Sequence, residues 1–264
     1  MLFDTHAHYD DEWFDEDRDE LLRTMPEYGV GLIVNPGCDV PTSRTAVQLA
    51  HTYPHVYAAV GIHPENAKGW TQGDVQAIEQ LAHEEKVQAI GEIGLDYYWL
   101  KQSPETTPSK EEQQVIFRTQ MALAQRLQLP VIIHDRDAHA DCLAIVKEFP
   151  AVHGVYHCYS GSYETAKELI DLGWMISFTG VITHDNSKKV RRILQNIPLE
   201  NIMIETDSPY MTPKPYKVKG QRTRNCSRYV HCVAETIADI IGRTPEEVER
   251  ITFDNGKRFF RIPD

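Results

Sequence analysis

The feature that most constrains this chain is a rhythm that runs through most of its length. A short apolar run rich in β-branched residues is followed by a polar turn and then by an amphipathic stretch with helical periodicity. Parallel strands need crossover helices between them, so eight such units predict an α/β (β/α)8 TIM barrel. The predicted strands are residues 2–4, 31–35, 56–61, 87–91, 131–134, 154–157, 174–178 and 201–205.

The segments between these strands predict the outer layer of the barrel. At 264 residues the chain has room for two domains, but one α/β barrel also reaches this size. We therefore expect a single domain over residues 1–264 with extra C-terminal helices. Residues 95–108 are too long for a usual connection and are predicted to be irregular. The predicted helices are residues 17–28, 41–53, 71–83, 109–127, 139–149, 162–172, 187–197, 228–241 and 245–260.

An open, doubly wound sheet is the alternative fold. It would concentrate polar residues at one switch point, whereas here polar residues follow the apolar runs all along the chain. No G-x-G-x-x-G or P-loop motif follows a predicted strand, so the sequence does not favour a nucleotide cofactor. The barrel is the better interpretation.

Histidines and carboxylates stand where six of the predicted strands end, and in a barrel these ends meet at one mouth. A single such histidine usually caps a loop or satisfies a carbonyl group. Many ionisable groups in one buried mouth are costly, however, unless metal ions compensate them. The residues are His6, His8, His63, Glu92, His134, His157 and Asp207.

We expect this mouth to hold two divalent metal ions. His6 and His8 alternate with Ala7 and so point to one side of the first strand. Imidazole and carboxylate ligands without a thiolate suit Zn, Mn, Fe or Ni, whereas Mg prefers more oxygen. The expected ligands are His6, His8 and Asp207 for one ion, His134 and His157 for the other, and Glu92 as the bridge between them.

A pair of ions ~3.5–4 Å apart clamps a phosphoryl or carbonyl centre and acidifies a water molecule. We assign Glu92 and Asp207 to catalysis, with Asp207 placed to accept a proton from that water or to orient it. His63 belongs to neither ligand set. It is either a substrate contact or a structural histidine before Pro64.

Charge is unevenly distributed along the chain. The net charge of −12 excludes a general nucleic-acid coat protein. Residues 208–234 nevertheless contain no acidic residue and six basic ones, a pattern that fits a nucleic-acid backbone. We expect Arg222 and Arg224 to contact substrate. Nearby aromatic residues either stack unpaired bases or simply border the core: Tyr210, Tyr216, Tyr97, Tyr98 and Trp99.

The remaining composition bears on the compartment. The first residues have no basic region followed by an apolar core, and no apolar run approaches the ~20 residues of a membrane span. The five cysteines form no C-x-x-C pair and leave an odd one, which favours reduced thiols. We expect a cytoplasmic protein without membrane contact.

With these motifs in order, the sequence resembles the TatD-type metal-dependent deoxyribonucleases, a branch of the amidohydrolase-like barrels. Residues 91–96 and 205–210 are specific to this family, whereas a His-X-His motif alone is not. Residues 224–227 lack the Pro that usually follows the Asn, and Glu65 replaces a frequent second His. The motifs that carry the resemblance are residues 3–8, 61–64, 89–97, 134–138, 157–161 and 205–210.

The resemblance implies a TIM barrel with metal ligands at the six positions assigned above. It also implies metal-dependent hydrolysis of DNA phosphodiesters, in some members as a 3′ exonuclease on single strands, and it supports His63 as a phosphate contact. Two other functions remain open from the residues alone. One is a small-molecule amidohydrolase, lactonase or phosphoesterase, and the other is a non-catalytic metal-binding protein, for which Asp207 would be unnecessary.

Overall fold

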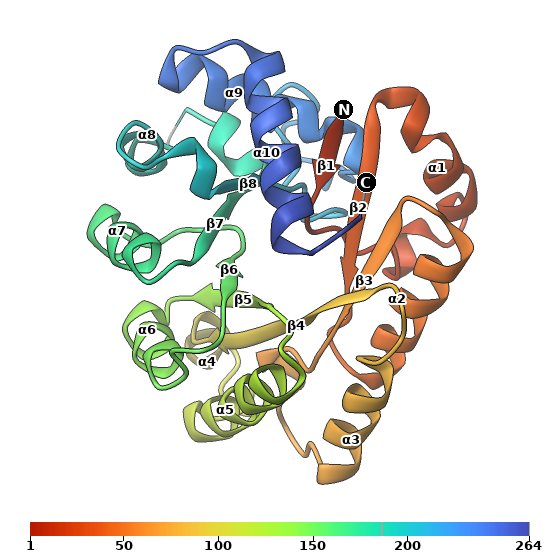
Figure 1. Ribbon diagram of the computed structural model, residues 1–264, viewed down its shortest axis with the longest axis vertical. Coiled ribbons are helices and arrows are strands. Elements are labelled where there is room, and N and C mark those ends of the chain that lie inside the picture. Colours follow the sequence, from red (N-terminus) through yellow and green to blue (C-terminus); the bar gives the residue numbers. More distant parts are fainter. Residues whose placement is uncertain (186, 264) are drawn as a thin grey trace.

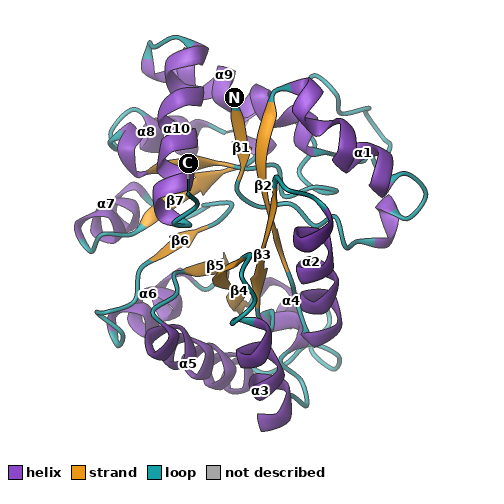
Figure 2. Ribbon diagram, turned by 45° about the vertical axis from the view of Figure 1, so that its right-hand side comes forward, coloured by secondary structure: helices purple, strands orange, loops and turns teal. Residues whose placement is uncertain are grey.

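The computed structural model describes residues 1–185 and 187–263 of the chain. In this part, eight parallel strands follow one another in sequence order around a nearly closed barrel, with helices on the outside (Figures 1 and 2). The predicted barrel is confirmed. The strands are β1 (Leu2–Asp4), β2 (Val30–Pro36), β3 (Val56–Val60), β4 (Val87–Asp96), β5 (Val131–Arg136), β6 (Gly154–Tyr156), β7 (Met175–Phe178) and β8 (Ile202–Ile204).

The last strand returns to the first just beyond the two strand ends. The N–H of His8 donates to the carbonyl oxygen of Ser208 at 2.7 Å, and the N–H of Asp207 donates to that of His6 at 2.9 Å. These bonds place the segment after β1 directly beside the segment after β8. The first and the last polar motifs of the chain therefore lie side by side.

The helices largely follow the predicted ranges, with shorter ends. The predicted helix over residues 17–28 ends earlier, and Met25–Tyr28 forms a 3-10 turn around Pro26, which has no N–H to continue the helix. The helices are α1 (Arg18–Thr24), α2 (Val40–Thr52), α3 (Gln72–Leu81), α4 (Tyr98–Gln102), α5 (Lys110–Leu127), α6 (His139–Lys147), α7 (Tyr163–Asp171), α8 (Lys188–Leu194), α9 (His231–Ile241) and α10 (Pro245–Phe259).

The prediction of an irregular segment over residues 95–108 was wrong at its start. β4 continues through Asp96, and α4 occupies Tyr98–Gln102. The Asp96 carboxylate accepts hydrogen bonds from the N–H groups of Tyr98 at 2.9 Å and Trp99 at 3.3 Å. Because this carboxylate satisfies N–H groups that begin the helix, it nucleates α4 immediately after the strand.

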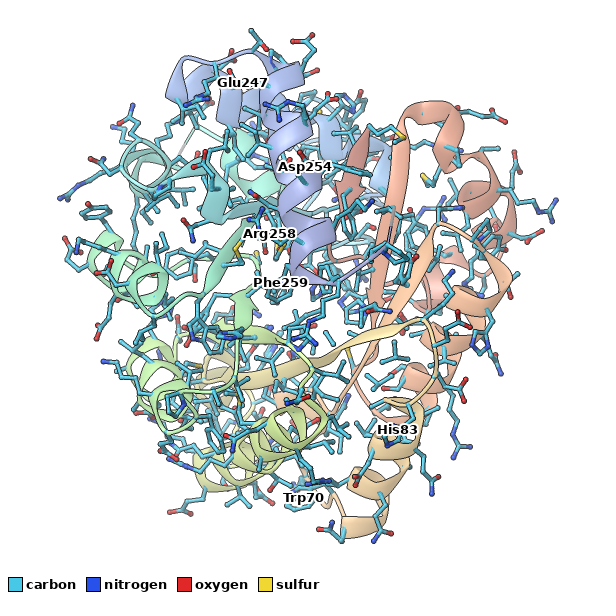
Figure 3. The ribbon with its side chains drawn as sticks, in the orientation of Figure 1. Trp70, His83, Glu247, Asp254, Arg258 and Phe259 are labelled. Carbon is cyan, nitrogen blue, oxygen red and sulfur yellow. The ribbon has the colours of Figure 1, made fainter. Side chains whose placement is uncertain are left out.

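The barrel interior has its own apolar core, formed by one residue from each strand together with Phe260 and Ile262 beyond α10. Residues from all eight strands meet only inside the barrel, so these side chains face inward. Phe259, labelled in Figure 3 at the end of α10, packs against this cluster. The eight strand residues are Phe3, Val34, Ala59, Ala89, Ile132, Val155, Met175 and Met203.

This core determines where the polar side chains point. Side chains on a strand alternate with a period of two, so a residue two positions beyond an inward one also faces inward. His134 follows Ile132 by two positions, and His157 follows Val155 by two. The apolar core thus fills one end of the barrel, and the polar cluster follows it at the other.

Gly94 allows β4 and β5 to approach closely at this level. It has a φ of 143°, and a Cβ atom at this position would overlap the carbonyl oxygen of His134. Only glycine tolerates this combination of backbone conformation and contact. The close approach brings the strand that carries Glu92 against the one that carries His134.

Candidate metal centre

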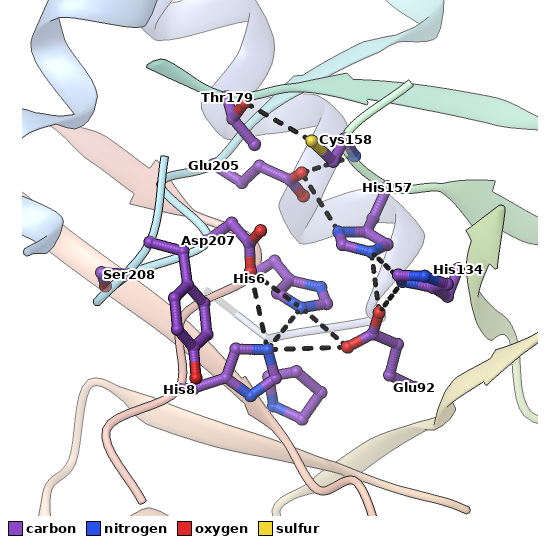
Figure 4. Close-up of polar contacts among 12 residues, drawn as sticks. His6, His8, Glu92, His134, His157, Cys158, Thr179, Glu205, Asp207 and Ser208 are labelled. Atoms are coloured by element: carbon purple, nitrogen blue, oxygen red, sulfur yellow. Dashed lines mark hydrogen bonds and ion pairs between the residues drawn. The ribbon is translucent and has the colours of Figure 1, made fainter. Parts of the chain in front are cut away.

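Glu92 lies at the centre of the cluster, between two pairs of histidines (Figure 4). Its Oε2 atom is 3.3 Å from Nε2 of His6 and 3.5 Å from Nε2 of His8. Its Oε1 atom is 2.7 Å from Nδ1 of His134 and 2.8 Å from Nε2 of His157. Each carboxylate oxygen therefore faces one pair of imidazole rings, as expected of a bridging ligand.

Asp207 lies beside the first pair of histidines, His6 and His8. The Nε2 atoms of His6 and His8 are 3.0 Å apart, and Oδ1 of Asp207 lies 3.9 Å and 3.6 Å from them. Asp207 has a φ of 53°, a left-handed conformation that is uncommon for non-glycine residues. Burial raises the pKa of Asp207 to about 6, although His157 and His8 act in the opposite direction.

The second pair has a different neighbour, His63. Nε2 of His157 is 3.3 Å from Nδ1 of His134, and Nε2 of His63 is 3.5 Å from Oε1 of Glu92. Nδ1 of His63 accepts a hydrogen bond from the N–H of Glu65 at 3.2 Å. Burial lowers the pKa of His63, so the ring is neutral and carries its proton on Nε2. His63 thus faces the cluster as a hydrogen-bond donor.

Two further carboxylates, which the sequence did not assign, orient the second pair of histidines. Oε1 of Glu205 is 3.4 Å from Nδ1 of His157, and Oδ2 of Asp96 is 3.1 Å from Nε2 of His134. Both side chains are buried. Carboxylates that hold the second nitrogen of a ligating histidine fix its tautomer and its orientation. The sequence could have identified Glu205 by its position two residues before Asp207, which places both residues on the same face of an extended strand.

Glu205 is itself fixed by two donors. Its Oε1 atom accepts from the N–H of Cys158 at 2.6 Å, and its Oε2 atom accepts from the hydroxyl of Ser177 at 2.7 Å. Cys158 directs its thiol toward the hydroxyl of Thr179 at 3.6 Å (Figure 4).

The start of the chain is held in place by Asp4. Its carboxylate accepts from the N–H of Thr206 at 2.8 Å, from the Thr206 hydroxyl at 2.6 Å and from the Ser227 hydroxyl at 2.5 Å. Burial raises the pKa of Asp4 to about 7 despite these donors. This contact joins β1 to the segment after β8, immediately before His6 and Asp207.

The cluster fits divalent metal ions by its donor chemistry. It offers imidazole nitrogens and carboxylate oxygens in closely spaced groups, among them His6, His8 and Glu92. Nδ1 of His6 is buried without a hydrogen-bond partner. Burial lowers the pKa of His134, but Asp96 and Glu92 outweigh it and raise this pKa to about 9. Carboxylates that favour positive charge on an imidazole also favour a bound cation, which would displace the protons.

The two predicted arginine contacts have different surroundings. Arg224 donates from Nη1 to Oδ1 of Asp17 and to the carbonyl oxygen of Trp13, both at 2.7 Å. This hydrogen bonding lowers the pKa of Asp17. Arg222 is exposed and lies over the Trp13 ring at 3.8 Å. Arg224 therefore holds the segment after β8 against the one after β1, while Arg222 faces solvent.

The aromatic candidates for base stacking differ in their exposure. The Tyr97 hydroxyl donates to Asp141 at 2.8 Å, and its side chain is buried, so Tyr97 belongs to the core edge. Trp99, Tyr210 and Tyr216 are partly exposed, and Tyr216 stacks on Tyr229 at 3.8 Å. Trp99 and Tyr210 therefore keep exposed faces that are suited to stacking.

Comparisons with known proteins identify the family of this chain. A family model described as TatD related DNase matches residues 3–261. The uncharacterized metal-dependent hydrolase YabD of Bacillus subtilis (strain 168) is 44% identical over 264 residues, which cover 99% of this chain and 100% of that protein. The 3'-5' ssDNA/RNA exonuclease TatD of Klebsiella pneumoniae (strain 342) is 32% identical, with 99% of this chain and 98% of that protein covered.

Solved structures share the fold. The crystal structure of YJJV, a TatD homologue from Escherichia coli K12, has a TM-score of 0.89 and 29% identity, covering 99% of this chain and 98% of that one. The Escherichia coli phosphotriesterase homology protein, at 16% identity and a TM-score of 0.67 with 98% of each chain covered, shows the same barrel architecture. Among the described residues, no helix combines the length and apolarity that crossing a membrane requires.

Proposed function

This chain belongs to the TatD related DNase family and is a metal-dependent hydrolase of ester bonds, and from this premise we propose that it removes nucleotides from the 3′ ends of single-stranded DNA. The observation that carries the proposal is the position of Glu92, with one carboxylate oxygen toward His6 and His8 and the other toward His134 and His157. We propose two divalent ions, one for each pair of histidines.

The two pairs of histidines with Glu92 and Asp207 would hold these ions, which would act as Lewis acids on a phosphodiester oxygen and would lower the pKa of a bound water molecule. The protein then needs a base near neutrality. Asp207 fits this role by its position, because its Oδ1 atom lies 3.9 Å from Nε2 of His6 and 3.6 Å from Nε2 of His8. Its left-handed backbone directs the carboxylate over the same histidines that Glu92 contacts.

Other residues position the substrate in this proposal. The neutral His63 ring donates from Nε2, so it suits a non-bridging phosphate oxygen. Arg222 and Lys217 line a hollow together with Pro209, which stands two positions after Asp207. In this proposal both basic side chains contact the next phosphates of the strand. Arg224 contributes by holding this segment in place through Asp17.

The test is cleavage of a single-stranded oligonucleotide labelled at its 5′ or 3′ end, with Mn²⁺, Mg²⁺ or Zn²⁺ added to the metal-free protein. We expect the 5′-labelled strand to shorten from its 3′ end one nucleotide at a time. A protein that leaves the strand intact but hydrolyses a lactone or a small phosphoester would instead be a small-molecule hydrolase on the same barrel.

A further inference from the structure

An apolar pocket lies directly beside the metal centre. It has a volume of about 320 Å³, near the lower limit of ~300–1,000 Å³ for ligand pockets, so it accommodates one small group. Phe178 and Ile182 form part of its wall and are almost fully buried, with exposed fractions of 1% and 2%. Its apolar lining consists of Phe178, Val181, Ile182, Val190 and Met211.

The pocket and the metal centre share side chains. His134, His157 and Asp207 line the pocket as well as the cluster around Glu92. A substrate group in this pocket would therefore lie next to the bond that is cleaved at the metal centre. The hydrolytic step proposed above requires no apolar neighbour at this position, because phosphate, water and metal ions are all polar.

A second pocket adjoins the first across Val181 and Met211, which line both. It has a volume of about 510 Å³, and its positive charge comes from Lys217 and Arg222. Tyr210 contributes a partly exposed ring to the same lining. The two pockets thus differ in character, because one is apolar and small and the other is larger and basic.

We infer that the apolar pocket binds the base of the terminal nucleotide, the one that the reaction releases, while the basic pocket holds the remaining strand. The inference rests on the proposed nuclease function. Nucleobases are flat and largely apolar on their faces, so they suit the pocket, whereas the charged backbone suits Lys217 and Arg222. Val181 and Met211 then form the ridge that the strand crosses.

This arrangement has a consequence for the mode of cleavage. Phe178 and Ile182 form a buried wall of the apolar pocket, whereas Val181 and Met211 at its rim are exposed. We expect the buried wall to stop a strand that enters the pocket over this rim. The pocket would therefore impose cleavage at a strand end and release single nucleotides, so a circular single strand should remain uncut.

The test compares two oligonucleotides that differ only at the 3′-terminal nucleotide, one ordinary and one lacking its base. For the wild-type protein we expect kcat/KM to be higher for the ordinary end by about tenfold or more, a difference of about 1.4 kcal/mol per tenfold. Equal kcat/KM values for the two ends, or cleavage of a circular single strand, would overturn the inference while leaving the nuclease function in place.

Two substitutions probe the pocket itself. Val181 is 39% exposed, so Val181→Trp fills the pocket from its rim without disturbing the core. We expect this variant to lose most of the preference for the ordinary end, measured as the ratio of the two kcat/KM values. Met211→Ala removes the other half of the ridge and should also reduce the preference. Val115→Trp on α5, which is 52% exposed, is the matched control and should behave as wild type.

A small phosphodiester separates this inference from the proposed function. Methyl p-nitrophenyl phosphate reports the chemistry of the centre without a nucleotide. If it is hydrolysed while neither oligonucleotide is cut, the nuclease function is wrong and the inference falls with it. If both oligonucleotides are cut but Val181→Trp retains the full preference of the wild type, only the assignment of the pocket is wrong.

Discussion

Replacing Glu205 by Gln tests whether this carboxylate positions His157 for metal binding. Glu205 accepts from the Cys158 N–H and the Ser177 hydroxyl and lies 3.4 Å from Nδ1 of His157. Gln has the same shape, its carbonyl oxygen can still accept from Cys158, and the Ser177 hydroxyl can rotate to accept from the amide. Packing is therefore retained, and the main loss is the negative charge beside the His157 ring.

The expected magnitude follows from this contact. Removing a partner of a ligating histidine typically reduces metal affinity or activity 10- to 100-fold, or about 1.4–2.7 kcal/mol. We expect Glu205→Gln to fall in this range for metal affinity, measured by competition with a fluorescent chelator. Glu205→Ala should also lower the free energy of unfolding by roughly 2–6 kcal/mol, because it leaves the Cys158 N–H and the Ser177 hydroxyl without their acceptor.

A readout on the metal-free protein makes the test specific. Glu205 helps to hold the pKa of His157 well above its ordinary value, against the effect of burial. This pKa, followed by NMR, should fall in Glu205→Gln. Glu168→Gln on the surface of α7 makes the same chemical change and should alter neither quantity. Wild-type metal affinity together with an unchanged His157 pKa in Glu205→Gln would refute the positioning role.

Four other substitutions give distinct outcomes. Asp207→Asn should reduce kcat by ~10²–10⁴-fold while the protein keeps much of its metal, measured by elemental analysis; retained kcat would remove Asp207 from proton transfer. Arg222→Ala should weaken DNA binding and flatten the slope of log K against log salt by about 0.7, whereas Arg224→Ala should mainly lower Tm. Asp17→Asn should cost about 1 kcal/mol of unfolding free energy near neutral pH. Because Arg224 lowers the Asp17 pKa below 3.8, that difference should shrink as urea denaturation is repeated at pH values below 3.8, and a constant difference would exclude the ion pair as its cause.

The barrel and the clustering of histidines and carboxylates at its mouth were predictable because the strands carry a local signal. Some apolar runs end at a polar residue that keeps the inward alternation, as Val155 and His157 do on the sixth strand. Glu92 does not follow this alternation, because it stands three positions after the inward Ala89, where the register of β4 shifts. The assignment of Glu92 as the bridge used only strand order, and the distances of its two oxygens agree with it. Strand order suffices here because a barrel fixes which strands are neighbours.

What the sequence could not supply depends on contacts between distant segments. Arg224 looked like a free positive charge, but Asp17 lies 207 positions away in sequence and pairs with it. Asp96 lay outside the predicted fourth strand, because the glycines at 91 and 94 interrupt its apolar pattern. The compartment, which was inferred from the spacing and odd number of the cysteines and from the first residues of the chain, stays a prediction.

The acidic character of the chain is compatible with a polyanionic substrate once distance is considered. At physiological ionic strength exposed charges are screened beyond about 8 Å, so the net charge of −12 acts weakly on an approaching strand. Close to the centre, the segment after Asp207 contributes Lys217 and Arg222 without any acidic residue in its stretch. For the proposed DNA substrate, local charge would therefore govern binding, while the acidic remainder of the surface would disfavour DNA elsewhere on the protein. Lower ionic strength should extend the repulsion, so binding should strengthen less at low salt than for a basic nuclease with the same number of phosphate contacts.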